Sequence, residues 1–387
     1  MAPRTRLLVF LVSTPLVALV TVGGVIGEPK TVAPQQSLGD LRVFYDVVSL
    51  IRDAYVEPVN VDKVMDGAMR GLTDGLDSSS AFLQPEEVKA FETKTAAPAG
   101  DVGLMVTRQF YLRVLGVRDG SPAARAGLQA GDYIRMIDGK PTRDMSAVTG
   151  RRLLAGAPGS KVSLTVIRGN TADPHEFALV REAATGPIAT SKMVGDVAHV
   201  RVSSFGPGLP GTLRTIFDGL QKARTSAVID LRGIADGELQ TGIDAARLFV
   251  KSGTLAVKAG RAGTPQRTEA KAGDGVISVP VVLLVSNGTS HAAELFAAAL
   301  SGNKRAEIVG EPTIGLAAEQ KLVPLPQGYG LWITHARYMT VDGATPLHGR
   351  GLAPDLAVQI PLVGFDELPP STDVPLERAI AHLKSKR

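Results

Sequence analysis

Apolar residues along this chain follow first a helical spacing and later a strand spacing. Between Leu41 and Leu72 they recur every three or four positions, as on amphipathic helices, with a break at Glu57-Pro58. From about residue 100 onward, short apolar runs of strand length are bounded by glycine, proline and aspartate. After Ala183 such runs alternate with helical stretches, which predicts central strands covered by helices. The pattern indicates an α/β protein of several domains.

The change in the spacing of apolar residues divides the chain into predicted domains. A third N-terminal helix is expected to begin at Pro85, because proline suits the first turn and the acidic Glu86 and Glu87 suit the helix dipole there. The expected ranges are 1–27 for an apolar N-terminal segment, 28–99 for a linker that ends at Ser37 and a helical region, 100–182 for a strand-rich domain, and 183–387 for an α/β domain. In the last domain we expect strands at Val197–Val202, Ser226–Leu231, Val281–Val285 and Leu331–Thr340, and helices at Leu213–Ala223, Leu239–Val250, His291–Leu300 and Val374–Lys384.

Composition narrows the function classes. The chain has 387 residues, of which 44% are hydrophobic and 21% charged, as in ordinary globular proteins. Its 42 basic and 38 acidic residues leave a net charge of only +4, and 5% aromatic residues offer few rings for stacking on bases. We therefore expect no nucleic-acid partner. The sequence contains no cysteine, which is compatible with an exported protein that needs no disulfides.

The first 27 residues indicate membrane targeting. Arg4 and Arg6 precede Leu7–Gly27, which are 21 residues without a charge. A spanning helix needs about 20 apolar residues, whereas the apolar core of a cleaved signal peptide has about 7–15. The length favours an uncleaved signal anchor, and Pro15 keeps a cleaved signal peptide open. Because flanking arginines stay on the cytoplasmic side, the rest of the chain is expected outside a bacterial-type inner membrane, facing the periplasm or another extracytoplasmic space.

One stretch, Pro280–Gln320, combines a buried strand, a polar turn and an apolar helix: PVVLLVSNGTSHAAELFAAALSGNKRAEIVGEPTIGLAAEQ. Many hydrolases mount a nucleophile on such a strand-turn-helix corner. The stretch resembles the active-site segment of the carboxyl-terminal processing peptidases, or tail-specific proteases, whose pattern runs N-x-G-S-A-S-A-S-E and then G-E-P-T-x-G-K-x-x-x-Q. The resemblance implies a crotonase-like core, a catalytic serine and lysine, and no cofactor.

Both halves of that dyad differ in this sequence. Aligned on Glu294, the nucleophile position of the family is His291, and the base position, 25 residues later, is Leu316. Gln320 matches the family's glutamine. Without a serine and a lysine at these positions the resemblance implies a catalytically degenerate member.

A second motif, DLRGIADG at residues 230–237, resembles the family's D-L-R-x-N-x-G-G turn, which helps to form the oxyanion hole. Asp236 stands at its first glycine and Gly237 at its second, and the amide of Ala292 follows the nucleophile position. A carboxylate beside an oxyanion site disfavours the negative charge that develops there. A side chain at a glycine position is also expected to alter the turn.

Residues from about 100 to 182 resemble a PDZ domain. GDYIRMIDG at 131–139 matches the G-D-x-I-x-x-I-D-G signature, and a helix is expected around Ser146–Leu154. Val102, Gly103, Leu104 and Met105 stand where a PDZ domain places the loop whose N–H groups bind a peptide carboxylate. The resemblance implies that C-terminal peptide tails are partners. Packing of this domain on its neighbour, without a peptide, is the alternative, since Asp101 adds negative charge beside the loop.

Other chemistry at the corner stays open. Ser290 is an alternative nucleophile, although adjacent side chains are expected to point in different directions. His291 is an alternative nucleophile or base, and with Glu294 it has the i, i+3 spacing of metal ligands, but no third ligand is in view and no metal is expected. The remaining histidines, at positions 175, 199, 335, 348 and 382, are interpreted as structural.

These observations predict a membrane-anchored, extracytoplasmic pseudoprotease. Its partners would be peptide C-terminal tails, an active protease relative or an envelope complex, with the membrane bound through the N-terminal segment. The alternative is an active serine-type endopeptidase that cleaves near protein C-termini. A third possibility is a purely structural homodimer, since AYVEPV at 54–59 followed by LDSSSAFLQPEE at 76–87 resembles the N-terminal helical region that helps to arrange dimers in some family members. Without that resemblance, these segments are simply helices that pack on a core.

Overall fold

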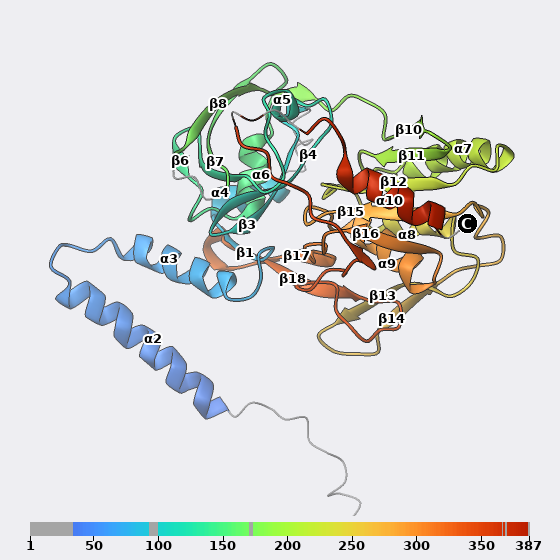
Figure 1. The fold of residues 1–387 in the computed structure, drawn as a ribbon. Coiled ribbons are helices and arrows are strands. Elements are labelled where there is room, and N and C mark those ends of the chain that lie inside the picture. Colours follow the sequence, from blue (N-terminus) through green and yellow to red (C-terminus); the bar gives the residue numbers. More distant parts are fainter. Residues whose placement is uncertain (1–33, 93–99, 170–172, 366, 368–369, 386–387) are drawn as a thin grey trace, which may run out of the picture. The chain divides into compact units, whose positions relative to one another are not determined.

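The structure is a computed structural model that describes residues 34–92, 100–169, 173–365, 367 and 370–385 (Figure 1). The predicted membrane segment 1–27 lies outside the described residues. The predicted end of the linker at Ser37 is wrong, because helix α2 (Pro34–Ala54) already begins at Pro34. Proline is compatible with the first turn of a helix, where its missing N–H would have no partner. Within the described part of the chain, no helix is both long and apolar enough to cross a membrane.

The chain divides into two compact units, residues 1–68 and 69–387. In the first unit, α2 exposes large apolar side chains, including Leu41, Tyr45 and Leu50. Helix α3 (Val61–Asp74) follows, and the predicted third helix is α4 (Pro85–Glu92). Both N-terminal helices and the helix at Pro85 are thus confirmed.

An antiparallel sheet occupies the region from residue 104 to 180. Its strands run in the order β3-β4-β5-β7-β8, so that β3 and β8 form its edges. The strands are β3 (Leu104–Gln109), β4 (Tyr111–Val117), β5 (Tyr133–Ile137), β7 (Lys161–Ile167) and β8 (His175–Val180), while β6 (Lys140–Pro141) pairs with β5 and β2 (Gly100–Asp101) with β9 (Glu182–Ala183). The short helices α5 (Pro122–Arg125) and α6 (Ala147–Leu154) accompany it, each capped by a serine, Ser121 and Ser146. The predicted strand at 111–117 and helix near 146–154 are confirmed.

The second half contains a six-stranded sheet in the order β10-β11-β12-β15-β16-β19. Only β10 and β11 pair in antiparallel fashion, and the other neighbours are parallel. The strands are β10 (Ala189–Val194), β11 (Val197–Val202), β12 (Ala227–Asp230), β15 (Val281–Val285), β16 (Ala306–Gly310) and β19 (Leu356–Ala357).

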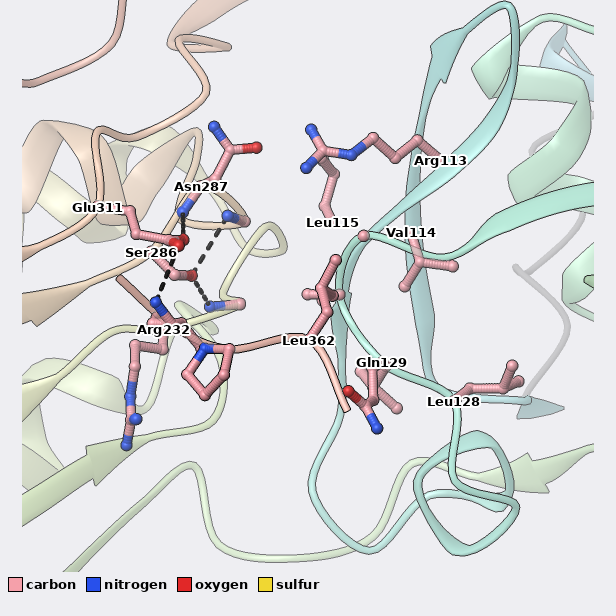
Figure 2. Close-up of a pocket in the computed structure, with 18 of the residues that line it drawn as sticks. Arg113, Val114, Leu115, Leu128, Gln129, Arg232, Ser286, Asn287, Glu311 and Leu362 are labelled. Atoms are coloured by element: carbon pink, nitrogen blue, oxygen red, sulfur yellow. Dashed lines mark hydrogen bonds between the residues drawn. The ribbon is translucent and has the colours of Figure 1, made fainter. Parts of the chain in front are cut away.

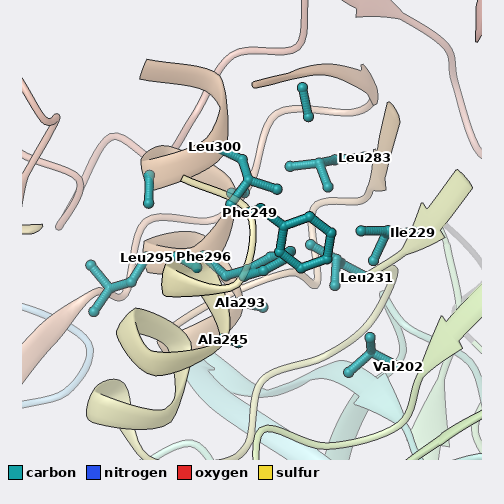
Figure 3. Close-up of a cluster of buried hydrophobic side chains, with 14 of the residues drawn as sticks. Val202, Ile229, Leu231, Ala245, Phe249, Leu283, Ala293, Leu295, Phe296 and Leu300 are labelled. Carbon is teal, nitrogen blue, oxygen red and sulfur yellow. The ribbon is translucent and has the colours of Figure 1, made fainter. Parts of the chain in front are cut away.

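Helices cover both faces of this sheet. Helices α7 (Leu209–Lys222), α8 (Leu239–Arg247) and α9 (Ala292–Gly302) share one hydrophobic core with it, and α10 (Val374–Ser385) packs on the other face. Under α9 the rings of Phe249 and Phe296 lie 5.6 Å apart, next to Ile229, Leu283 and Leu300 (Figure 3). The predicted strands and helices of this domain exist, and their ends differ from the prediction by a few residues.

A third, antiparallel sheet adjoins the α/β core. Its order is β1-β18-β13-β14, and β17 also pairs with β18. The strands are β1 (Ala81–Leu83), β13 (Thr254–Gly260), β14 (Gln266–Glu269), β17 (Ala318–Pro324) and β18 (Gly330–Met339). Residues from the N-terminal region therefore pair with the C-terminal half, as at Ala81 and Trp332.

Candidate active site

The predicted corner exists between β15 and α9. Strand β15 pairs in parallel with β12 and β16, and functional sites in such sheets lie beyond the carboxyl ends of the strands. Hydroxyl groups hold the turn: Ser286 Oγ accepts the N–H groups of Gly233 and Gly288, at 3.0 and 3.2 Å. Thr289 Oγ1 donates to the carbonyl of Leu231, at 2.8 Å. The turn is therefore fixed to the DLRG segment after β12.

His291 occupies the sharp point of this corner. Its backbone has φ 53° and ψ −118°, a conformation that residues other than glycine rarely adopt. A strained residue between a strand and a helix is the geometry of a nucleophile elbow. Helix α9 begins one residue later than predicted, at Ala292, so that His291 precedes the helix as its N-cap. The elbow is thus present with an imidazole in place of a hydroxyl.

Glu294 organises the residues around the elbow. Its carboxylate is fully buried and accepts four donors: Thr313 Oγ1 at 2.6 Å and Gly315 N at 2.6 Å on Oε1, and Leu316 N at 2.8 Å and His291 N at 3.2 Å on Oε2. Burial raises the pKa of Glu294 to about 6 in spite of these donors. Both oxygens are already in use, so neither is left free for a metal ion shared with His291.

Leu316 and His291 are brought together by this carboxylate. Because their amides bind the same oxygen, the two nitrogens are separated by no more than the sum of the two bonds. The side chain of Leu316 is 5% exposed and carries no group that accepts a proton. Gln320 lies further on, in β17, where its amide donates to Thr334 Oγ1 at 3.3 Å.

Ser290 directs its hydroxyl toward His291, which corrects the expectation that these adjacent side chains diverge. Ser290 Oγ lies 3.1 Å from His291 Nδ1, and the Ser290 amide donates to Ile234 O at 2.9 Å. Burial, together with the positive charge of Arg151, lowers the pKa of His291 to about 4, so the imidazole is neutral at pH 7. Ser290 itself is 0% exposed, and a substrate carbonyl cannot reach its oxygen in this conformation.

Asp236 lies in the turn after β12, on a backbone that glycines still shape. Left-handed φ values fall on Gly233 and Gly237, at 67° and 97°, so the turn accommodates Asp236 without strain at that residue. A Cβ atom on Gly237 would lie 2.5 Å from the backbone of Phe205. One carboxylate oxygen of Asp236 is buried without a hydrogen-bond partner, and burial raises the pKa of the group.

A pair that the sequence reasoning missed lies near the elbow. His348 Nε2 is 3.5 Å from Asp77 Oδ2, and both residues line a cavity of about 410 Å³. Burial opposes ionisation of Asp77, but His348 and the amides of Ser79 and Ser80 hold its pKa well below the usual range. Only the folded structure reveals this pair, since 271 positions separate the two residues along the chain. His199, by contrast, pairs with the buried Asp230 at 3.0 Å, as a structural histidine would.

The antiparallel sheet of residues 104–180 contacts the corner through glycines. A Cβ atom on Gly116 would lie 1.7 Å from Gly233 O, and one on Gly288 would lie 1.7 Å from Leu115 O. Beside this contact is a cavity of about 760 Å³, with Arg113 and Leu128 on one wall and Glu311 on the other (Figure 2). Strand β4 therefore meets the turns after β12 and β15 backbone to backbone.

The four predicted peptide-binding residues lie at the start of β3. Val102, Gly103 and Leu104 are buried, and Met105 is half-buried. Val102 O and Gly103 O accept amides of their own domain, at 3.0 and 2.8 Å. The Gly103 amide donates to Asp101 Oδ1 at 2.7 Å.

A PDZ-like sheet joined to a parallel sheet with a nucleophile elbow defines a PDZ-containing peptidase fold. The PDZ domain model matches residues 113–168, and the model of peptidase family S41 matches residues 196–358. The chain belongs to the carboxyl-terminal-processing proteases of peptidase family S41.

Individual relatives are similar over most of the chain. A carboxyl-terminal-processing protease of Synechocystis sp. is 32% identical over 86% of this chain and 80% of its own length. A carboxy-terminal-processing protease of Bartonella bacilliformis is 29% identical over 85% of this chain and 77% of its own. Among solved structures, a photosystem II D1 C-terminal processing protease superposes with a TM-score of 0.68 at 26% identity, over 84% of this chain and 94% of that one.

Proposed function

We propose that this protein is a membrane-anchored, extracytoplasmic pseudoprotease that binds peptide tails of other proteins or scaffolds an envelope proteolytic complex. The observation that carries the proposal is that a leucine, Leu316, stands where the family has its catalytic lysine. A serine/lysine dyad works because burial lowers the pKa of the lysine, which then takes the hydroxyl proton as a neutral amine. Leucine cannot do so at any pH. Here the backbone amide of Leu316 binds Glu294, and its side chain only fills space.

The environment of Asp236 supports the same proposal. An oxyanion hole requires hydrogen-bond donors directed at the developing negative charge. The buried, unpaired oxygen of Asp236 adds an acceptor in the turn that resembles this site. Two independent features therefore oppose peptide hydrolysis.

A cleavage assay tests the proposal. The purified full-length chain is incubated with an unfolded protein that carries an apolar C-terminal tail, alongside Ser290→Ala, His291→Ala and, as a matched control, the more exposed His335→Ala. We expect none of the four proteins to cleave above the blank, since loss of a protease nucleophile or base costs about a million-fold in turnover. Cleavage by the wild type that His291→Ala abolishes and His335→Ala retains would refute the pseudoprotease.

An active serine-type endopeptidase is the second candidate, and the contact of Ser290 Oγ with His291 Nδ1 at 3.1 Å supports it. A neutral imidazole beside a hydroxyl is the pair that activates a serine. The complete burial of Ser290 argues against it. In the same assay, cleavage that is lost in both Ser290→Ala and His291→Ala would establish this alternative.

The location is proposed from residues 1–27, which would anchor the chain in an inner membrane with the rest facing the periplasm. An active relative, an envelope protein or a second copy of the chain is the proposed partner. Protease added to spheroplasts should digest the chain while intact cells protect it. Protection in spheroplasts would overturn the proposed orientation.

A further inference from the structure

The peptide-binding edge of the PDZ-like sheet is β3. This strand ends the sheet order and pairs with β4 alone, while α6 packs alongside it. An extended peptide can add to such an edge as a further strand. Capture of a free C-terminus additionally requires unoccupied N–H groups at Val102–Met105, in the loop before β3 and the first two residues of that strand.

Directly before this loop, Asp101 supplies a carboxylate that already binds one of the loop amides. Asp101 Oδ1 accepts the Gly103 amide at 2.7 Å. The guanidinium of Arg118 holds the same carboxylate with two donors, Nη1 to Oδ2 at 3.0 Å and a short contact of Nη2 with Oδ1. The anion and its counter-charge are therefore both supplied from within the domain.

The loop has little freedom to offer a second arrangement. Gly103 has φ 80°, and a Cβ atom there would lie 2.1 Å from Ser121 Cβ, so the loop packs tightly on the N-terminus of α5. Val102 O and Gly103 O are bound to the amides of Ala123 and Arg118. A peptide carboxylate would have to displace Asp101 from both partners, exchanging one charged hydrogen bond for another while two carboxylates repel each other.

We propose that the groove along β3 binds extended peptide segments without using a C-terminal carboxylate, because Asp101 fills that position. The partner is then an internal, extended segment of another protein, or a tail whose end projects past the loop. Asp101 is a specificity-determining residue and Arg118 its positioning residue. This inference rests on the proposed peptide binding. It differs in that the groove recognises the extended backbone of the peptide and not its C-terminal carboxylate.

The test compares three forms of one fluorescent apolar peptide on the full-length protein. The peptide ends in a free acid, ends in an amide, or continues into a Gly-Ser extension, and its Kd is measured by polarisation. For the wild type we expect the three Kd values to agree within about threefold, because the peptide terminus makes no contact with the loop amides in any of the three forms. For Asp101→Ala, which frees the Gly103 amide and Arg118, the acid should bind about tenfold more tightly than the amide.

Two further variants keep the test decisive. Asp173→Ala removes an equal charge from an exposed position of the same domain and should behave as the wild type. Arg118→Gln leaves the Asp101 carboxylate at the loop without its counter-charge, so the acid should bind at least about threefold more weakly than the amide. This second variant retains Asp101 and serves if Asp101→Ala fails to fold.

The outcomes separate the two proposals. Wild-type binding of the acid alone would overturn the inference and leave peptide binding intact. Failure of all three peptides to bind both the wild type and Asp101→Ala would overturn the proposed peptide binding itself. An acid preference in Asp173→Ala equal to that in Asp101→Ala would also refute the role of Asp101, since any lost charge would then suffice.

Discussion

The substitution Glu294→Gln tests whether a buried charge holds the elbow together. Glutamine has the shape of glutamate, but only its carbonyl oxygen accepts hydrogen bonds. Of the four donors on Glu294, the two on one oxygen can be kept, and the other two face an NH₂ group that cannot accept them. The change therefore removes two charge-assisted hydrogen bonds without opening a cavity.

The magnitude follows from two opposing effects. Two hydrogen bonds to a charged group are worth about 1.5–3 kcal/mol each, so their loss costs about 3–6 kcal/mol. Removing the buried charge recovers about 2 kcal/mol, because burial raises the pKa of Glu294 from 4.5 to about 6. The lost hydrogen bonds outweigh the recovered cost of the buried charge, and we expect the free energy of unfolding to fall by about 1–4 kcal/mol at pH 7.

The pH dependence gives an independent check. A carboxyl group with a raised pKa in the folded state takes up its proton there first, so the folded state gains stability as the pH falls from about 6 to 4.5. This gain reaches about 2 kcal/mol in the wild type and is absent from Glu294→Gln, so the difference between them should widen on acidification. Comparing the two proteins cancels the contributions of other titrating groups.

Urea unfolding followed by circular dichroism at pH 7 and pH 5 measures both effects. The matched control is Glu238→Gln, an exposed residue before α8, for which a change within about 0.5 kcal/mol is expected. A Glu294→Gln protein as stable as the wild type at pH 7, or a difference that narrows at pH 5, would refute the reasoning.

Two further predictions concern the same region. Gly116→Ala should cost about 2–3 kcal/mol in the free energy of unfolding, because the new methyl would lie 1.7 Å from Gly233 O. The control Gly211→Ala, in an open position of α7, should stabilise the protein by up to about 1 kcal/mol. Equal effects of the two variants in urea unfolding would disprove the close contact at Gly116. His291, with its pKa lowered to about 4, should show no imidazole titration in NMR spectra between pH 5.5 and 8, with the signal assigned through His291→Gln; a midpoint near 6.5 would contradict its burial.

Periodicity predicted most of the fold. The strands at 111–117, 197–202 and 281–285 have the predicted ends, because apolar runs of strand length there are bounded by strong turn residues. Helix α7 begins at Leu209, before the predicted Leu213, since Pro210 lies in its first turn, where proline is tolerated. The local pattern of apolar residues therefore predicts which elements form. It does not predict the exact end of a helix whose first turn contains a proline.

The site was predictable only in part. A resemblance in sequence located His291, Leu316 and Asp236, but three of the four donors to Glu294 come from a loop 19–22 positions away, and hydrogen bonds at that distance leave no periodic signal. The pair of Asp77 and His348 joins opposite ends of the chain. Asp77 precedes β1 and His348 follows β18, and the pairing of these two strands in the folded protein helps to bring the residues together.

The shape of this site and its chemistry are set by different residues. The backbone is fixed by glycines at close approaches: Gly315 cannot carry a Cβ atom beside Gly351 N at 2.5 Å, and Gly237 cannot carry one beside Phe205. Glu294 then binds the strained turn to the following loop through amides, which every residue except proline supplies. The side chains of positions 291 and 316 are not needed for that scaffold. A family member can therefore keep the elbow while histidine and leucine occupy those positions, and the fold alone does not establish hydrolysis.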